Sequence, residues 1–242
     1  MLHLIPLLLS TTALAWPDDA AWQPLQMTNG SCDVDRLLSW DAAGDGVVED
    51  AHLDLVGEAC DEAHAAYWAF DSQAVYLRLR LADSPLDGAE LRAGAWGALI
   101  DLDGNPTRDD AQLVLNGVQG ELHLRSNASP ISGWDDVAEE VLARRLDPFG
   151  SDLARVVDAG TSLGGGADYF LDLSWPVDSF LVELDLSHSS TIGLFVATGD
   201  GSEGLLNNDL AGCDATTDSC AELTHTCVPV RVSDDSDGDG MS

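Results

Sequence analysis

Apolar and polar residues alternate along the centre of the chain, between residues 65 and 103. One set of alternating positions is entirely apolar: Val75, Leu77, Leu79 and Leu81. The positions between and after them are mostly polar: Tyr76, Arg78, Arg80 and Ala82. A period of two predicts a strand with one apolar and one polar face. Residues 71–73 separate this strand from an apolar-aromatic run that ends at Phe70, which predicts an antiparallel hairpin.

Further short apolar runs follow at a spacing that is regular for a β protein. We expect strands at residues 95–100, 111–118, 121–125, 154–157, 169–173, 192–197 and 227–232. Eight or nine strands with turns between them predict an all-β fold, an antiparallel two-sheet β-sandwich with a jelly-roll-like arrangement. One short helix is expected at residues 177–184, with Pro176 in its first turn. Apolar residues at helical spacing predict a second helix at residues 134–146.

The charge of the chain is strongly one-sided. Acidic residues number 43 against 10 basic ones, all of them Arg, and the formal net charge is −33. Such a field repels nucleic acid and anionic membranes and attracts cations. Calcium binding is one interpretation, and a solubility surface or adaptation to salt are the alternatives.

The chain begins with features of an export signal. Residues 1–15 contain a short apolar core and end in Ala13-Leu14-Ala15, a cleavage pattern that precedes Trp16. No later apolar run is long enough to span a bilayer, so no membrane insertion is expected. We therefore expect a secreted, extracellular or cell-surface protein. After the signal we expect a lead-in at residues 16–32, a sandwich domain at 33–232 and an acidic tail at 233–242.

An exported chain places its cysteines in an oxidising compartment. The five cysteines are Cys32, Cys60, Cys213, Cys220 and Cys227. We expect disulfides, with Cys32 bonded to Cys60 and one pair within the last three, which leaves one thiol over. A metal site with His225 is the alternative, although zinc sites favour closer cysteine pairs.

Two acidic segments suit calcium. The first follows the strand expected at residues 95–100 and contains Asp101, Asp103, Asn105, Asp109 and Asp110. Hard oxygen ligands on a turn bind calcium, and a turn stabilised by its own Asp and Asn side chains is the alternative. The second segment carries Asp235, Asp237, Asp239 and Gly240, which match the first half of an EF-hand-type loop. Calcium is accordingly the expected cofactor.

Three stretches resemble one family. Residues 67–83, 96–103 and 168–176 resemble the strands of family 9 carbohydrate-binding modules and of the wider DOMON-like sandwiches, in which aromatic and Leu-Tyr strands end at Asp. This resemblance covers roughly residues 33–232 and implies a sandwich that binds carbohydrate. It also favours an extended conformation for residues 134–146. The last nine residues resemble a thrombospondin type 3 calcium repeat, which implies a surface-displayed bacterial protein.

Flat aromatic side chains are the candidates for a sugar-binding platform. The four candidates are Tyr67, Tyr76, Trp96 and Trp134. Aromatic rings cover the apolar faces of sugars, while nearby carboxylates and amides bind the hydroxyls. Core packing is the alternative for each of them.

No catalytic motif stands out. With so many acids, carboxylate pairs are inevitable, and the histidines show no metalloprotease or triad spacing. The sequence thus predicts a non-catalytic module that binds polysaccharide or a cell-surface glycan, with calcium supporting its loops. The alternatives are a structural or adhesive spacer domain without a glycan ligand and, third, a hydrolase.

Overall fold

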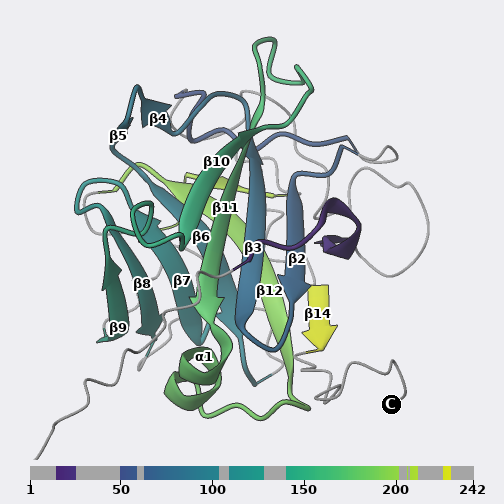
Figure 1. The fold of residues 1–242 in the computed structure, drawn as a ribbon, viewed down its shortest axis with the longest axis vertical. Coiled ribbons are helices and arrows are strands. Elements are labelled where there is room, and N and C mark those ends of the chain that lie inside the picture. Colours follow the sequence, from purple (N-terminus) through teal and green to yellow (C-terminus); the bar gives the residue numbers. More distant parts are fainter. Residues whose placement is uncertain are drawn as a thin grey trace, which may run out of the picture.

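The computed structural model describes residues 15–25, 50–58, 63–103, 109–127, 140–201, 206, 208–211 and 226–229. In this part of the chain, two large antiparallel sheets make up most of the fold, with one α-helix at one end (Figure 1). This confirms the predicted all-β sandwich with one short helix. Within the described part of the chain, no helix has both the length and the apolar character that a membrane span requires.

The first sheet has five strands. Its order is β1 (Gln23–Pro24), β2 (Ala66–Phe70), β3 (Ala74–Leu81), β11 (Tyr169–Pro176) and β10 (Ala154–Asp158). A 3-10 helix, η1 (Asp19–Ala21), precedes β1. The hairpin of β2 and β3 is the one predicted from the alternating pattern.

The second sheet has seven strands. Its order is β13 (Asp209–Leu210), β12 (Thr191–Gly199), β6 (Ala95–Asp101), β7 (Ala111–Asn116), β8 (Glu121–Ser126) and β9 (Glu140–Leu146), and β14 (Thr226–Pro229) also pairs with β12. Residues 83–94, between β3 and β6, contain a small hairpin of β4 (Leu86–Asp87) and β5 (Glu90–Leu91). The helix α1 (Val177–Glu183) follows Pro176 as predicted.

The core lies between the two sheets. Apolar side chains from β3 and β11 on one side and from β6, β7, β8 and β12 on the other belong to one buried cluster. The apolar positions of β3 are among them: Val75, Leu77, Leu79 and Leu81. Burial of this surface is the main stabilising term of such a fold.

The other face of β3 is buried as well, which the alternation by itself did not indicate. Tyr76 is 1% exposed, Arg78 6% and Arg80 3%. Residues 15–25 contribute to this cover, since Trp22 packs against both Tyr76 and Arg78. The first sheet therefore has a covered outer face.

The helix predicted at residues 134–146 is wrong for its described part. Residues 140–146 form β9, which pairs with β8 along the edge of the seven-stranded sheet. The open edge of β8 offers backbone hydrogen bonds to an extended segment, and this tertiary pairing outweighs a short helical pattern. Residues 134–139 lie outside the described residues.

Several predictions fall where the structure gives no description. Cys32, Cys60, Cys213 and Cys220 lie outside the described residues, as do the calcium-type tail positions Asp235, Asp237 and Asp239. Cys227 lies in β14, and its pairing stays a prediction.

Candidate ligand and metal sites

A buried ion pair organises the outer face of the five-stranded sheet. Arg78 of β3 lies opposite Asp172 of β11 in the strand register. Its Nε and Nη2 donate to the two carboxylate oxygens of Asp172 at 2.7 and 2.9 Å, and Arg155 Nε donates to the same carboxylate at 2.7 Å. Asp172 is fully buried. One carboxylate therefore holds two guanidinium groups, and the bidentate contact fixes the orientation of Arg78.

Aromatic rings stack on these cations. The guanidinium carbon of Arg78 lies 4.2 Å from the ring centre of Trp22 and 4.4 Å from that of Phe170. Arg80 contacts the same Phe170 ring, also at 4.4 Å. Cation–π contacts of this kind stabilise a desolvated guanidinium and hold the ring in place. Rings and cations thus form a continuous layer over β3 and β11.

Arg80 has partners of another kind. Its Nε donates to the carbonyl of His64 at 3.0 Å, its Nη1 to Thr161 Oγ1 at 2.5 Å and its Nη2 to the Tyr67 hydroxyl at 3.4 Å. Among the residues that the structure describes, no carboxylate lies within ion-pairing distance of this guanidinium. Neutral oxygens therefore satisfy a buried cation in a chain whose net charge is strongly negative.

An open cavity of about 820 Å³ lies beside this layer. Its described lining combines aromatic rings, guanidinium groups, a hydroxyl and carboxylates: Asp19, Trp22, Ala63, Tyr67, Arg78, Arg80, Val157, Asp158, Ala159, Thr161 and Phe170. Such a mixture of apolar surface with a few polar groups is typical of small-ligand sites. Of the four predicted platform residues, Tyr67 lines the cavity.

The other described platform candidates are buried. Tyr76 lies under Trp16 and Trp22, and Trp96 is fully enclosed, with its indole N–H donating to the His52 carbonyl at 2.8 Å. Neither ring can present a face to a sugar, so the alternative of core packing holds for both. Trp134 lies outside the described residues.

Sequence reasoning missed Trp22, Arg78, Arg80 and Phe170 as cavity residues. The signal for two of them was available, because Arg78 and Arg80 share one face of an alternating strand. Trp22 and Phe170 join them only through pairing between distant strands.

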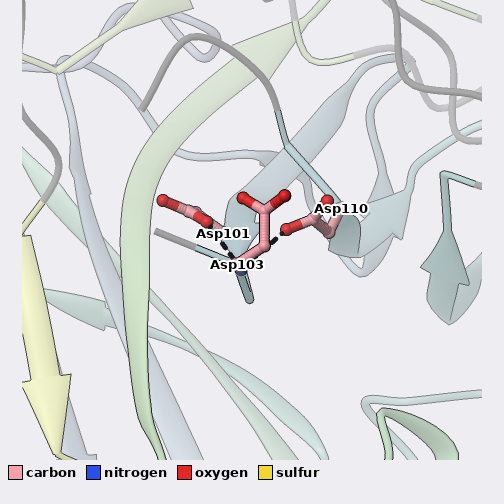
Figure 2. A group of neighbouring side chains, drawn as sticks. All are labelled: Asp101, Asp103 and Asp110. Atoms are coloured by element: carbon pink, nitrogen blue, oxygen red, sulfur yellow. Dashed lines mark hydrogen bonds between the residues drawn. The ribbon is translucent and has the colours of Figure 1, made fainter. Parts of the chain in front are cut away.

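The acidic turn between β6 and β7 brings three predicted metal residues together. Carboxylate oxygens of Asp101, Asp103 and Asp110 all lie within 4.8 Å of one another. Figure 2 shows the three side chains next to one another, with Asp101 as the last residue of β6 and Asp103 and Asp110 in the turn that leads to β7. The backbone N–H of Asp103 donates to Asp101 Oδ1 at 3.0 Å and to Asp110 Oδ2 at 3.1 Å. The arrangement combines an Asp-stabilised turn with a set of oxygens that could hold a cation.

Asp109, another predicted metal residue, does not belong to this cluster. Asp109 is fully buried and accepts a hydrogen bond from Gln112 Nε2 at 2.9 Å. Asp109 and Asp110 are adjacent, and successive residues entering a strand point to opposite sides. The structure therefore gives Asp109 a place beside Gln112, and Asn105 lies outside the described residues.

Comparison with known proteins adds no further assignment. No model of a protein family matches this chain, and no curated protein matches it.

Proposed function

We propose that this chain is an exported, non-catalytic module that binds carbohydrate in the open cavity on the outer face of the five-stranded sheet. The observation that carries the proposal is the composition of that cavity. The half-buried Tyr67 and Phe170 offer ring surface, and the buried Trp22, two guanidinium groups, Thr161 and two aspartates complete the lining. Sugars present apolar C–H faces and hydroxyls that both donate and accept, and these groups complement both features.

The layer beneath the cavity is preorganised. Phe170 contacts both Arg78 and Arg80, and Tyr67 packs edge-on against Phe170 with ring centres 5.8 Å apart. A ligand that docks here meets side chains already fixed by ion pairs and stacking. Fewer rotamers are then lost on binding, which favours affinity.

The carboxylates of the cavity support binding over hydrolysis. Asp19 and Asp158 are both exposed. Glycoside hydrolysis requires a carboxylic acid kept protonated by a desolvated environment, opposite a second carboxylate. The exposed pair is better suited to accepting hydrogen bonds from sugar hydroxyls.

We expect the exported chain to be retained by at least one insoluble polysaccharide in a pull-down panel, and Tyr67→Ala to weaken that retention at least about tenfold. The reason is loss of ring surface at the cavity wall. Val157→Ala, which removes an exposed lining side chain, should weaken binding less. Val118→Ala, exposed between β7 and β8 on the other sheet, is the matched control and should bind normally.

Retention by no polysaccharide would favour the alternative of a structural or adhesive spacer domain. If Tyr67→Ala and the parent are retained equally, and circular dichroism shows that both chains are folded, the binding site lies outside this cavity.

We also propose that calcium supports the turn that carries Asp101, Asp103 and Asp110. Three carboxylates this close repel one another, and a hard divalent cation relieves that repulsion. Millimolar calcium should raise the unfolding midpoint. The free energy of unfolding should rise by up to about 2.7 kcal/mol when calcium is at a hundredfold excess over its dissociation constant. The variant Asp103→Asn, at an exposed position, should lose most of this stabilisation by calcium. The variant Asp87→Asn, on β4, should keep it. A midpoint that does not respond to calcium in the parent chain contradicts the proposal.

A further inference from the structure

The start of the described chain is fixed to the outer face of β3. The carbonyl oxygen of Ala15 accepts a hydrogen bond from the hydroxyl of Tyr76 at 3.0 Å. The next residue, Trp16, packs against the Tyr76 ring with centres 5.9 Å apart and lies under the guanidinium of Arg155 at 4.5 Å. Ala15 is also the last residue of the predicted export signal. The peptide bond that would be cleaved is therefore held at a defined position.

The Tyr76 hydroxyl has two acceptors in this arrangement. Besides the Ala15 carbonyl, it contacts Asp71 Oδ2, also at 3.0 Å. A phenol has a single hydrogen to donate, so the two acceptors compete for it. Burial, and then the charge and hydrogen bond of Asp71, raise the pKa of Tyr76, so the phenol keeps that hydrogen. With Ala15 present, the two oxygens share this single hydrogen.

The Asp71 carboxylate is held in place by the hairpin turn. Its Oδ1 accepts hydrogen bonds from the backbone N–H groups of Gln73 at 2.7 Å and Ala74 at 2.9 Å. Its Oδ2 faces Tyr76. The turn therefore fixes a negative charge and a hydroxyl beside the beginning of the chain, before any ligand is added.

Cleavage after Ala15 would replace an acceptor by a donor at this point. Bond lengths of a peptide place the Trp16 nitrogen about 2.3 Å from the Ala15 oxygen. The nitrogen thus lies no more than about 5.3 Å from the Tyr76 hydroxyl oxygen. Hydrolysis adds one water, turns the Ala15 carbonyl into the carboxylate of the released signal and leaves an ammonium group on Trp16.

We propose that Asp71 and Tyr76 form a built-in binding site for the α-ammonium group of Trp16, which is created when the export signal is removed. The phenol then donates its hydrogen to Asp71 alone and accepts from the ammonium group through a lone pair. The carboxylate supplies the opposite charge, and charge-assisted hydrogen bonds of this kind are stronger than neutral ones. The new N-terminus is then bound to the outer face of the sheet. The segment that follows it, which contains the cavity residue Trp22, is held there as well. This inference rests on the proposed export and processing of the chain.

The sequence simplifies the test, because the ten residues counted as Lys or Arg are all Arg and no lysine side chain competes for acylation. The α-amino group is consequently the chain's single primary amine. The full chain is exported from a bacterial host, its first residue is identified by sequencing, and the amine is acylated at neutral pH. The rate is followed on the N-terminal peptide by mass spectrometry and compared with a free peptide of the same first residues.

We expect Trp16 as the first residue and acylation about tenfold slower than in the free peptide. Asp71→Asn retains an oxygen for the turn but removes the charge, and it should bring the rate close to that of the peptide. Tyr76→Phe should also raise the rate, and Asp87→Asn, at an exposed position of β4, should leave it slow.

Three results would overturn the inference. A first residue other than Trp16 refutes the processing step itself. Trp16 acylated as fast as the peptide, or slowly in both the parent and Asp71→Asn, refutes the site while leaving export and carbohydrate binding standing. As a second readout, acylation should lower the unfolding midpoint of the parent and have little effect in Asp71→Asn, and equal losses in both chains also count against the site.

Discussion

Asp172→Asn should unfold at a much lower urea concentration than the parent chain, with a loss of about 3–5 kcal/mol in the free energy of unfolding. The parent carboxylate accepts from Arg78 and Arg155 while fully buried. Asparagine keeps one acceptor oxygen but turns an N–H₂ group toward the guanidinium groups. Arg78 and Arg155 then lose this counter-charge, and the buried Arg78 is left with the fully exposed Asp19 at 3.8 Å.

Equilibrium urea unfolding followed by tryptophan fluorescence measures this effect. The comparison requires that the slope of the free energy of unfolding against urea concentration is the same in the variant and the parent. Asp158→Asn is the matched control, because it makes the same chemical change at an exposed position of the neighbouring strand. We expect the control to stay within about 0.5 kcal/mol of the parent. A similar small loss for Asp172→Asn would mean that the ion pair contributes little to stability.

Trp96→Ala should lose about 3–5 kcal/mol of stability. Trp96 is fully buried in the core between the sheets, so its removal leaves a large cavity. The His52 carbonyl also loses the hydrogen bond that it accepts from the indole N–H. This variant distinguishes a core residue from a ligand platform, because a platform residue would lose binding and keep its stability.

Thermal and urea unfolding of Trp96→Ala and of Tyr67→Ala, side by side, make the comparison. We expect the larger loss of stability for Trp96→Ala. A stable Trp96→Ala chain with weakened polysaccharide retention would reverse the assignment of the two residues.

The local pattern was sufficient for several elements of the fold. Alternation along β3, the turn at Asp71 and the break at Pro176 predicted a hairpin and a helix that the structure contains. These features depend on the geometry of neighbouring residues, which is why sequence spacing alone reports them. The acidic turn behaves in the same way, since Asp101, Asp103 and Asp110 are close in sequence as well as in space.

Distant pairing decided the rest. The pattern at residues 140–146 suited a helix, and only the free edge of β8 made it a strand. Tyr67, Tyr76 and Trp96 were equal candidates by residue type. The structure separates them, with Tyr67 at a cavity wall and the other two enclosed.

The composition and spacing of this chain determined an acidic, all-β protein with a helix after Pro176 and an aspartate-rich turn after the strand that ends at Asp101. The tertiary structure decided which side chains share the outer face of β3. Arg78 meets Asp172 across 94 residues of sequence, and Tyr76 meets Ala15 across 61. Such contacts depend on strand order and register, because a shift by one residue would turn each of these side chains to the opposite face of the sheet.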